Sequence, residues 1–188
     1  MDEALQDNNI IAAVRLWLHS FVVELNLCPF AKRELAEQRL HYALSEASDE
    51  SQLLADLRKE LLRLNREPDI ETTLLIHPGV LTDFSDYNQF LADADDLIRL
   101  MQLEGVYQIA SFHPDYCFSG CHDSDAENYS NRSPYPMLHL LREQSLERAI
   151  ANYVGVEKIP QKNIEKMNAL GSKKLQQMLQ SCIDASKS

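Results

Sequence analysis

The order of its secondary-structure signals most limits the folds open to this chain. Three short runs rich in apolar and β-branched residues alternate with longer segments whose apolar residues recur at helical spacing. The three runs are RLHYALS (39–45), IETTLLIH (70–77) and VYQIASF (106–112). Strands separated by helices long enough to serve as crossovers predict an α/β fold, with a small, mainly parallel or mixed sheet of three or four strands flanked by helices. A length of 188 residues predicts one such domain over residues 1–188.

Start and stop signals bound the predicted helices. Apolar spacing predicts a buried helix over 8–27, which ends at Cys28-Pro29. A second helix starts after Ser48 and cannot extend past Pro68. A third runs from Thr82 or Asp83 to residue 104, before Gly105, which stands where a left-handed residue is expected. Helices at roughly 137–152 and 159–181 complete the chain, so the C-terminal region is predicted to be helical.

Two of the predicted strands end at a His-Pro pair. His77 and His113 each precede a proline, which favours an extended residue followed by a turn. If the two strands are parallel, both histidines leave the sheet at the same edge, where open α/β sheets bind ligands. We therefore expect the two imidazoles within about 10 Å of each other, or roughly two strand spacings.

The predicted histidine pair is open to three interpretations. Two neighbouring imidazoles can share a divalent metal. Alternatively, one acts as a general base near neutral pH and the other as a hydrogen-bond donor. In the third interpretation, both are turn residues bonded to nearby backbone and have no chemical role.

The long loop 114–136 holds the remaining candidate site residues. Asp115 can orient His113, while Glu127 and Arg132 flank a tyrosine, and an arginine there can take a carboxylate or phosphate at two points. In the alternative interpretation, Arg132 pairs with an acidic neighbour and only holds the loop. His139 is expected in the first turn of the next helix, near a dipole end that favours anions.

Two function classes follow. The first is a small-molecule enzyme, hydrolytic or transferase-like, whose catalytic residues are His77, His113, Asp115, Glu127 and Arg132. The second is a non-catalytic ligand-binding or regulatory module whose polar loop is a docking surface. A concave pocket beside these groups would favour the enzyme, and a flat exposed loop the module.

The cysteines suggest two further chemistries. Cys117-x3-Cys121-His122 resembles half of a zinc site, but no partner pair with suitable spacing follows. Cys28-Pro29-Phe30 is similar to the redox turn of glutaredoxins, which suggests a thiol-redox protein using Cys28. However, Cys28 follows a predicted helix, which places its thiol at the unfavourable dipole end. We therefore expect Cys28 to be a buried packing residue.

The net charge and the absence of certain motifs limit the possible binding partners and the cellular location. A net charge of −11 argues against nucleic acid as a partner. The acidic N-terminus has no positive region for a signal peptide, and no apolar run approaches bilayer-spanning length, so we expect a cytoplasmic protein with reduced thiols and no membrane partner. No phosphate-binding glycine motif occurs. A small-molecule ligand and a divalent metal remain as candidates, and the sequence leaves the cofactor and the oligomeric state open.

Several motifs together resemble one bacterial family. LNLCPFA (25–31), ETTLLIHP (71–78), FHPDY (112–116) and ENYSNRSPYP with LHLLRE (127–143) look like the family called domain of unknown function 1415. The resemblance covers nearly the whole chain. It implies a bacterial origin and a single-domain protein, and it implies no activity, cofactor or catalytic residue. Cysteine is not the usual residue of that family at positions 117 and 121, which weakens the zinc interpretation.

Overall fold

The computed structural model describes residues 2–187, with side chains from residue 6 onward. The chain divides into two compact units. The helical unit consists of Met1–Lys32, His113–Pro134 and Gly155–Ser188, and the sheet unit of Arg33–Phe112 and Tyr135–Val154. The prediction that residues 1–188 form a single domain stays a prediction.

The sheet unit contains a four-stranded mixed sheet. Its elements are β1 (Leu40–Leu44), α3 (Glu50–Arg66), β2 (Thr72–Ile76), α4 (Phe84–Leu100), β3 (Tyr107–Phe112), β4 (Met137–Arg142) and α5 (Glu143–Ala151). The strand order is β1-β2-β4-β3, with β1 and β2 parallel and β4 antiparallel to both of its neighbours. The predicted fold class is therefore confirmed. Strands β2 and β3 run in the same direction but are not adjacent, because β4 lies between them.

Strands β2 and β3 end at the same level of the sheet. Ile76 and Phe112 both pair with Met137 of β4. The hydroxyl of Tyr87, from α4, accepts a hydrogen bond from the Phe112 amide (3.0 Å) and donates one to the Met137 carbonyl (2.7 Å). Tyr87 is completely buried. A single side chain thus fixes the carboxyl end of β3 against the central strand.

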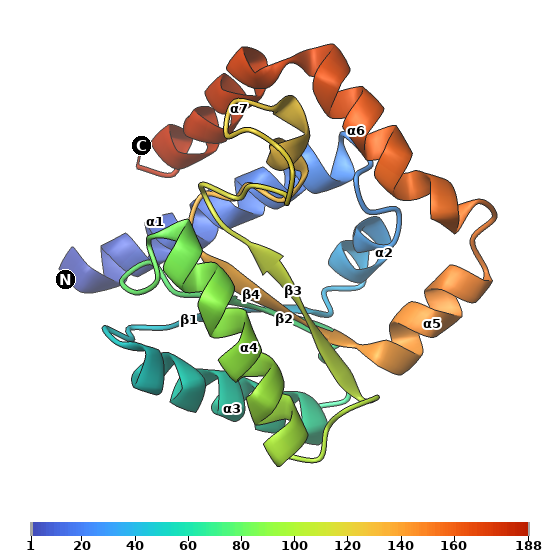
Figure 1. The fold of residues 1–188 in the computed structure, drawn as a ribbon. Coiled ribbons are helices and arrows are strands. Elements are labelled where there is room, and N and C mark those ends of the chain that lie inside the picture. Colours follow the sequence, from blue (N-terminus) through green and yellow to red (C-terminus); the bar gives the residue numbers. More distant parts are fainter. Residues whose placement is uncertain (1, 188) are drawn as a thin grey trace. The chain divides into compact units, whose positions relative to one another are not determined.

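Helices α3 and α4 lie together on one face of this sheet (Figure 1). Each starts at an aspartate in extended conformation: the Asp49 side chain accepts from the Gln52 amide, and the Asp83 side chain accepts from the amides of Ser85 and Asp86. Their apolar faces are buried, including Leu53, Leu57, Leu61, Leu64, Tyr87, Phe90, Ala94 and Ile98. Because each fully buried leucine contributes roughly 1.5–3 kcal/mol, this helix layer is the main stabilising contact of the sheet unit.

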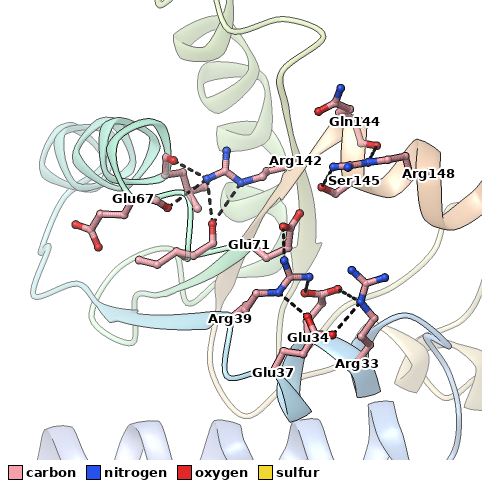
Figure 2. Close-up of polar contacts among 12 residues, drawn as sticks. Arg33, Glu34, Glu37, Arg39, Glu67, Glu71, Arg142, Gln144, Ser145 and Arg148 are labelled. Carbon is pink, nitrogen blue, oxygen red and sulfur yellow. Dashed lines mark hydrogen bonds and ion pairs between the residues drawn. The ribbon is translucent and has the colours of Figure 1, made fainter.

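At the end of the sheet where β1 and β2 begin, charged side chains connect neighbouring segments of the chain (Figure 2). Arg39 contacts the carboxylates of Glu34 (2.6 Å), Glu37 (3.0 Å) and Glu71 (3.4 Å). Arg142 donates to the carbonyls of Leu64 (2.6 Å) and Ile70 (3.0 Å) near the end of α3. These charged side chains bond to one another or to backbone carbonyls, so their role at this end of the sheet is structural.

The predicted helix over 137–152 is wrong in its first part: residues 137–142 form strand β4, and only α5 is helical. The sequence Met137–Arg142 occupies a central strand, with Leu138 and Leu140 fully buried. No glycine, proline or other turn residue separates this strand from α5, so the apolar run reads as the start of the helix. As a result His139 lies in β4, paired with Leu74 and Ala110, and not at a helix N-terminus.

The helical unit is built from both termini and the long loop. Its elements are α1 (Asp2–Trp17), η1 (Leu18–Val23), η2 (Ala126–Ser130), η3 (Val156–Lys158), α6 (Ile159–Leu170) and α7 (Ser172–Ala185), while α2 (Ala31–Ala36) crosses the boundary between the units. Helix α1 continues into a π-helical turn that ends at Val23, so the predicted helix over 8–27 starts and ends earlier than predicted and is irregular at its end. Gly171 divides the predicted helix over 159–181 into α6 and α7. None of the helices in residues 2–187 combines the length and apolarity needed to span a membrane.

Candidate functional site

His77 directly follows β2 and is completely buried. Its Nδ1 lies 3.0 Å from the carbonyl oxygen of Val80, which can only accept, so Nδ1 carries a proton. The ring stacks on Tyr87 with a centroid distance of 5.9 Å. Through these two contacts His77 holds the turn that leads from β2 to α4.

His113 directly follows β3 and is also completely buried, in the helical unit. Its Nδ1 accepts a hydrogen bond from the backbone amide of Asp115 (3.0 Å), and its own amide donates to Asn131 (3.3 Å). The backbone of Asp115 therefore orients this imidazole, in place of the predicted carboxylate. Since His77 and His113 belong to different units, the distance between their rings stays a prediction.

Arg132 and Glu127 make hydrogen bonds inside the long loop. The Arg132 guanidinium donates to the carbonyls of Tyr116 (3.1 Å) and Asp123 (2.8 Å) and lies over the Tyr129 ring at 4.7 Å. The arginine thus holds the loop through backbone carbonyls and not through an acidic neighbour. One carboxylate oxygen of Glu127 accepts from the Cys121 thiol at 2.9 Å. Both side chains have structural roles in this loop.

Asn128 is a loop residue that the sequence analysis missed. It is completely buried, accepts from the Phe118 amide (3.0 Å) and donates to the His122 carbonyl (2.8 Å). One amide side chain thereby closes the segment 118–122. Asparagine is common in polar loops for many reasons, so nothing in the sequence distinguishes this one.

The cysteines do not form a metal centre with the predicted ligands. In the described part of the chain, no three or more His, Cys, Asp or Glu side chains are grouped so that they could hold a metal ion. The hydrogen bond from Cys121 to Glu127 raises the pKa of that thiol to about 11, and burial raises the pKa of Cys117. Both thiols therefore stay protonated near neutral pH. Cys28 is half-buried, less enclosed than predicted.

An open hollow of about 580 Å³ lies where the loops after β1 and β2 meet the N-termini of α3 and α4. All of its residues belong to the sheet unit. They are Ser48, Asp49, Glu50, Ser51, Val80, Leu81, Thr82 and Asp86. The hollow therefore lies beyond the carboxyl ends of two adjacent parallel strands, the position where α/β sheets hold ligands. The site predicted from the sequence lies instead between the segment after His77 and the loop after β3, and because these segments belong to different units, that site stays a prediction.

Internal hydrogen bonds fix both walls of the hollow. On the β1 side, the Ser45 hydroxyl donates to Asp56 of α3 (2.6 Å) and accepts from the Ala47 amide (3.1 Å). On the β2 side, His77 holds Val80, and Leu81 adopts a left-handed conformation with φ 56°. Such a conformation is costly for a leucine and persists only where its surroundings enforce it. The hollow is thus preformed.

The two walls approach each other closely at Gly79. A Cβ atom at this position would lie 3.2 Å from the carbonyl oxygen of Ala47, in the opposite loop. A larger residue would have to push the loops apart by a few tenths of an ångström. The glycine therefore sets the spacing between the loops that follow β1 and β2.

Carboxylates and hydroxyls dominate the surface of the hollow, and no lysine or arginine lines it. Both oxygens of Asp49 accept from Gln52, one from its amide and one from its side chain, at 2.8 Å each. Glu50 and Asp86 add two further carboxylates to this surface, and both residues are exposed. The hollow therefore presents negative charge and hydroxyl groups to the solvent.

Comparisons with known proteins give a family and no further relative. Neither the curated proteins nor the solved structures contain a match to this chain. A family model described as a protein of unknown function, DUF1415, matches residues 9–177. Because this match covers most of the 188 residues, the chain belongs to the DUF1415 family.

Proposed function

We propose that this protein binds a small molecule in the hollow at the carboxyl ends of β1 and β2. The observation that carries the proposal is an open, polar hollow of about 580 Å³ at this edge, with walls that internal hydrogen bonds hold in place. Ser45, His77 and Gly79 support its walls without lining it. Their bonds place the lining residues before any ligand arrives, which lowers the entropic cost of binding.

The ligand that this lining suits is a small cation with hydrogen-bonding groups, such as an aliphatic amine. Glu50 and Asp86 offer carboxylates, while Ser48, Ser51 and Thr82 offer hydroxyls. An anion would meet like charge from the carboxylates that line the hollow. One N-terminal amide of α3 and two of α4 already bond to the capping aspartates, which leaves fewer amides to bind an anion. Attraction between an amine and exposed carboxylates weakens as salt increases.

Calorimetric titration with a diamine and a triamine tests this proposal. We expect saturable binding that weakens between low and physiological salt. The variant Glu50→Gln/Asp86→Asn should weaken it at least tenfold. The matched control is Asp69→Asn/Asp93→Asn, which removes the same charge from exposed positions outside the hollow and should leave the affinity within a factor of two. Equal losses in both variants would mean that only the net charge matters.

A catalytic role for His77 is a second candidate. Its Nδ1–H donates to Val80, which fixes the tautomer whose Nε2 is basic, the form needed in a general base. In this proposal His113, Asp115, Glu127 and Arg132 are the further catalytic residues of a hydrolytic or transferase-like enzyme, and His77 and His113 are the candidate ligands of a divalent metal.

Hydrolysis of p-nitrophenyl acetate and p-nitrophenyl phosphate tests the catalytic candidate. We expect turnover that His77→Gln abolishes while the circular dichroism spectrum is retained. Added Zn²⁺ or Mn²⁺ should raise the rate if the two histidines hold a metal. Unchanged turnover in His77→Gln would exclude this histidine as the base and leave the binding proposal standing.

We also propose a bacterial, cytoplasmic protein without a nucleic-acid or membrane partner. The resemblance supports the bacterial origin, and the net charge of −11 supports the absence of nucleic-acid binding. Fractionation of the source cells, followed by antibody detection, would test the location directly.

A further inference from the structure

The segment 117–122 of the helical unit contains a tight turn with a cysteine at each side: Cys117 precedes the turn and Cys121 ends it. The Cys121 amide donates to the Phe118 carbonyl (3.0 Å), which closes a turn over residues 118–121. The Cys117 sulfur lies 3.5 Å from the Cys121 carbonyl oxygen. The side chain of the first cysteine therefore already points at the backbone of the second.

Asn128 holds the two ends of this segment together. Its buried amide bonds to the Phe118 amide and the His122 carbonyl, the chain neighbours of the two cysteines. The tip of the turn remains adjustable, because Gly120 is exposed, has φ 85° and has no atom within 4 Å of a Cβ built on it. A disulfide needs its two Cα atoms within about 4.4–6.8 Å of each other. The Asn128 bonds keep the ends of the segment close, and the backbone at Gly120 can adjust to reach this distance.

We propose that Cys117 and Cys121 form a reversible disulfide by exchange with a low-molecular-weight disulfide. Both thiols are half-buried and therefore reachable by a small reagent. This site is independent of the hollow, which lies in the sheet unit.

The exchange takes two steps. One cysteine loses its proton and attacks the reagent RSSR, forming a mixed disulfide and releasing RS⁻, which takes up that proton. The second cysteine then loses its proton, attacks the protein sulfur of the mixed disulfide and releases the second RS⁻, which is protonated in turn. The two protein thiols are oxidised by two electrons, and RSSR is reduced to two RSH.

Disulfide formation removes the hydrogen bond from Cys121 to Glu127 and frees that carboxylate. In the reduced protein the same bond restrains the reaction, because it keeps the Cys121 thiol protonated. Glu127 thus slows the oxidation of the two cysteines. The disulfide therefore forms under sustained oxidising conditions.

Peptide mapping of the full chain after incubation with oxidised glutathione tests the proposal. Trypsin releases residues 100–132 as one peptide that contains Cys117 and Cys121 and neither of the other two cysteines. We expect this peptide to lose two hydrogens, to resist alkylation, and to recover both thiols after reduction. Cys28→Ser/Cys182→Ser should leave this result unchanged. Two alkylated thiols, two stable glutathione adducts, or a cross-link to Cys28 or Cys182 would overturn the proposal.

Two further variants probe the geometry. Glu127→Gln should speed alkylation of Cys121 at pH 8 at least tenfold, because the thiol loses the carboxylate that holds its proton; an unchanged rate would refute the restraint. Asn128→Ala should lower the ratio of internal to mixed disulfide at least tenfold, since the ends of the segment separate. If Asn128→Ala does not fold, Asn128→Asp, which keeps the acceptor for Phe118, replaces it, and an unchanged ratio would refute the role of the clamp.

Discussion

At the scale of single residues, His139 couples the stability of the fold to pH. The Thr72 hydroxyl donates to the Leu140 carbonyl (2.7 Å) and lies 2.7 Å from Nε2 of His139. Since the hydroxyl hydrogen is already used, Nε2–H of a neutral imidazole donates to Thr72. Burial lowers the pKa of His139 from 6.5 to about 4.

We predict a loss of stability as the pH falls from 6.5 toward 4. In this range the unfolded chain binds a proton at His139 and the folded protein does not, so the contribution is complete above pH 6.5 and lost on acidification. The size is at most about 3 kcal/mol. Urea denaturation of the wild type and of His139→Gln, which keeps a donor for Thr72 and cannot titrate, measures it as the difference between the two. Parallel pH curves would contradict the prediction.

Arg142 joins the end of β4 to the backbone at the end of α3. Besides the carbonyls of Leu64 and Ile70, it donates to the Tyr107 hydroxyl (3.1 Å). We predict that Arg142→Ala costs about 2–3 kcal/mol, because charged hydrogen bonds are lost and carbonyls near the end of α3 are left without a donor. Arg142→Lys should recover less than half of this, since an ammonium cannot reproduce the fork.

Arg148, which is also labelled in Figure 2, provides the matched control for that measurement. It is exposed and bonds only within α5, to Gln144 (3.2 Å) and Ser145 (3.1 Å). Arg148→Ala should change the free energy of unfolding by less than about 0.5 kcal/mol. Equal costs for both arginines, measured by urea denaturation, would show that Arg142 acts only through its charge.

At the scale of elements, the N-caps that begin the two face helices also form part of the surroundings of the hollow. We predict that Asp83→Ala costs about 1 kcal/mol, because the Ser85 and Asp86 amides lose their acceptor at 2.8 and 3.2 Å. Asp83→Ser should restore most of the stability, because a serine hydroxyl is an equally good cap. Thermal denaturation followed by circular dichroism compares the three proteins, and a serine variant as unstable as the alanine variant would contradict the cap explanation.

The elements also show how far the sequence could predict this fold. Three strands and two face helices were predicted to within a few residues, because each has a matching hydrophobic period and a clear cap or turn. Strand β4 was predicted as helix for two reasons. Its residues are largely buried on both faces, so apolar and polar residues do not alternate along it. It also passes directly into α5, so no turn residue marks its end. The π-helical turn at Leu18–Val23 has no such signal either.

The hollow was not predicted from the sequence. The expectation of parallel strands predicted only that His77 and His113 follow strand ends at one edge of the sheet, and the strand ends Ile76 and Phe112 do pair with the same residue, Met137. The lining consists of serine, threonine, acidic and aliphatic residues from two loops, residue types that are common at any helix N-terminus. The pairing of β1 with β2 and the close approach of Gly79 to Ala47 bring these loops together, and contacts between distant segments leave no local pattern.

At the scale of the whole molecule, the chain passes between its two units at residues 32–33, 112–113, 134–135 and 154–155. The three segments of the helical unit are separated by segments of the sheet unit, so assembling it requires closure of two long loops. That closure costs least after the sheet unit has formed, because folded intervening segments shorten the flexible chain. The helical unit should therefore have little independent stability.

We predict a single unfolding transition for the whole chain. Trp17, the sole tryptophan of the sequence, is buried in the helical unit, and its indole donates to the Arg132 carbonyl (2.9 Å). Its fluorescence reports that unit, while hydrogen exchange of amides in β2 and β4 reports the sheet unit. The two urea midpoints should coincide, as for a two-state protein. A fluorescence change completed while the strand amides remain protected would show that the helical unit unfolds separately; it would also make the Cys117–Cys121 segment accessible long before the hollow is lost.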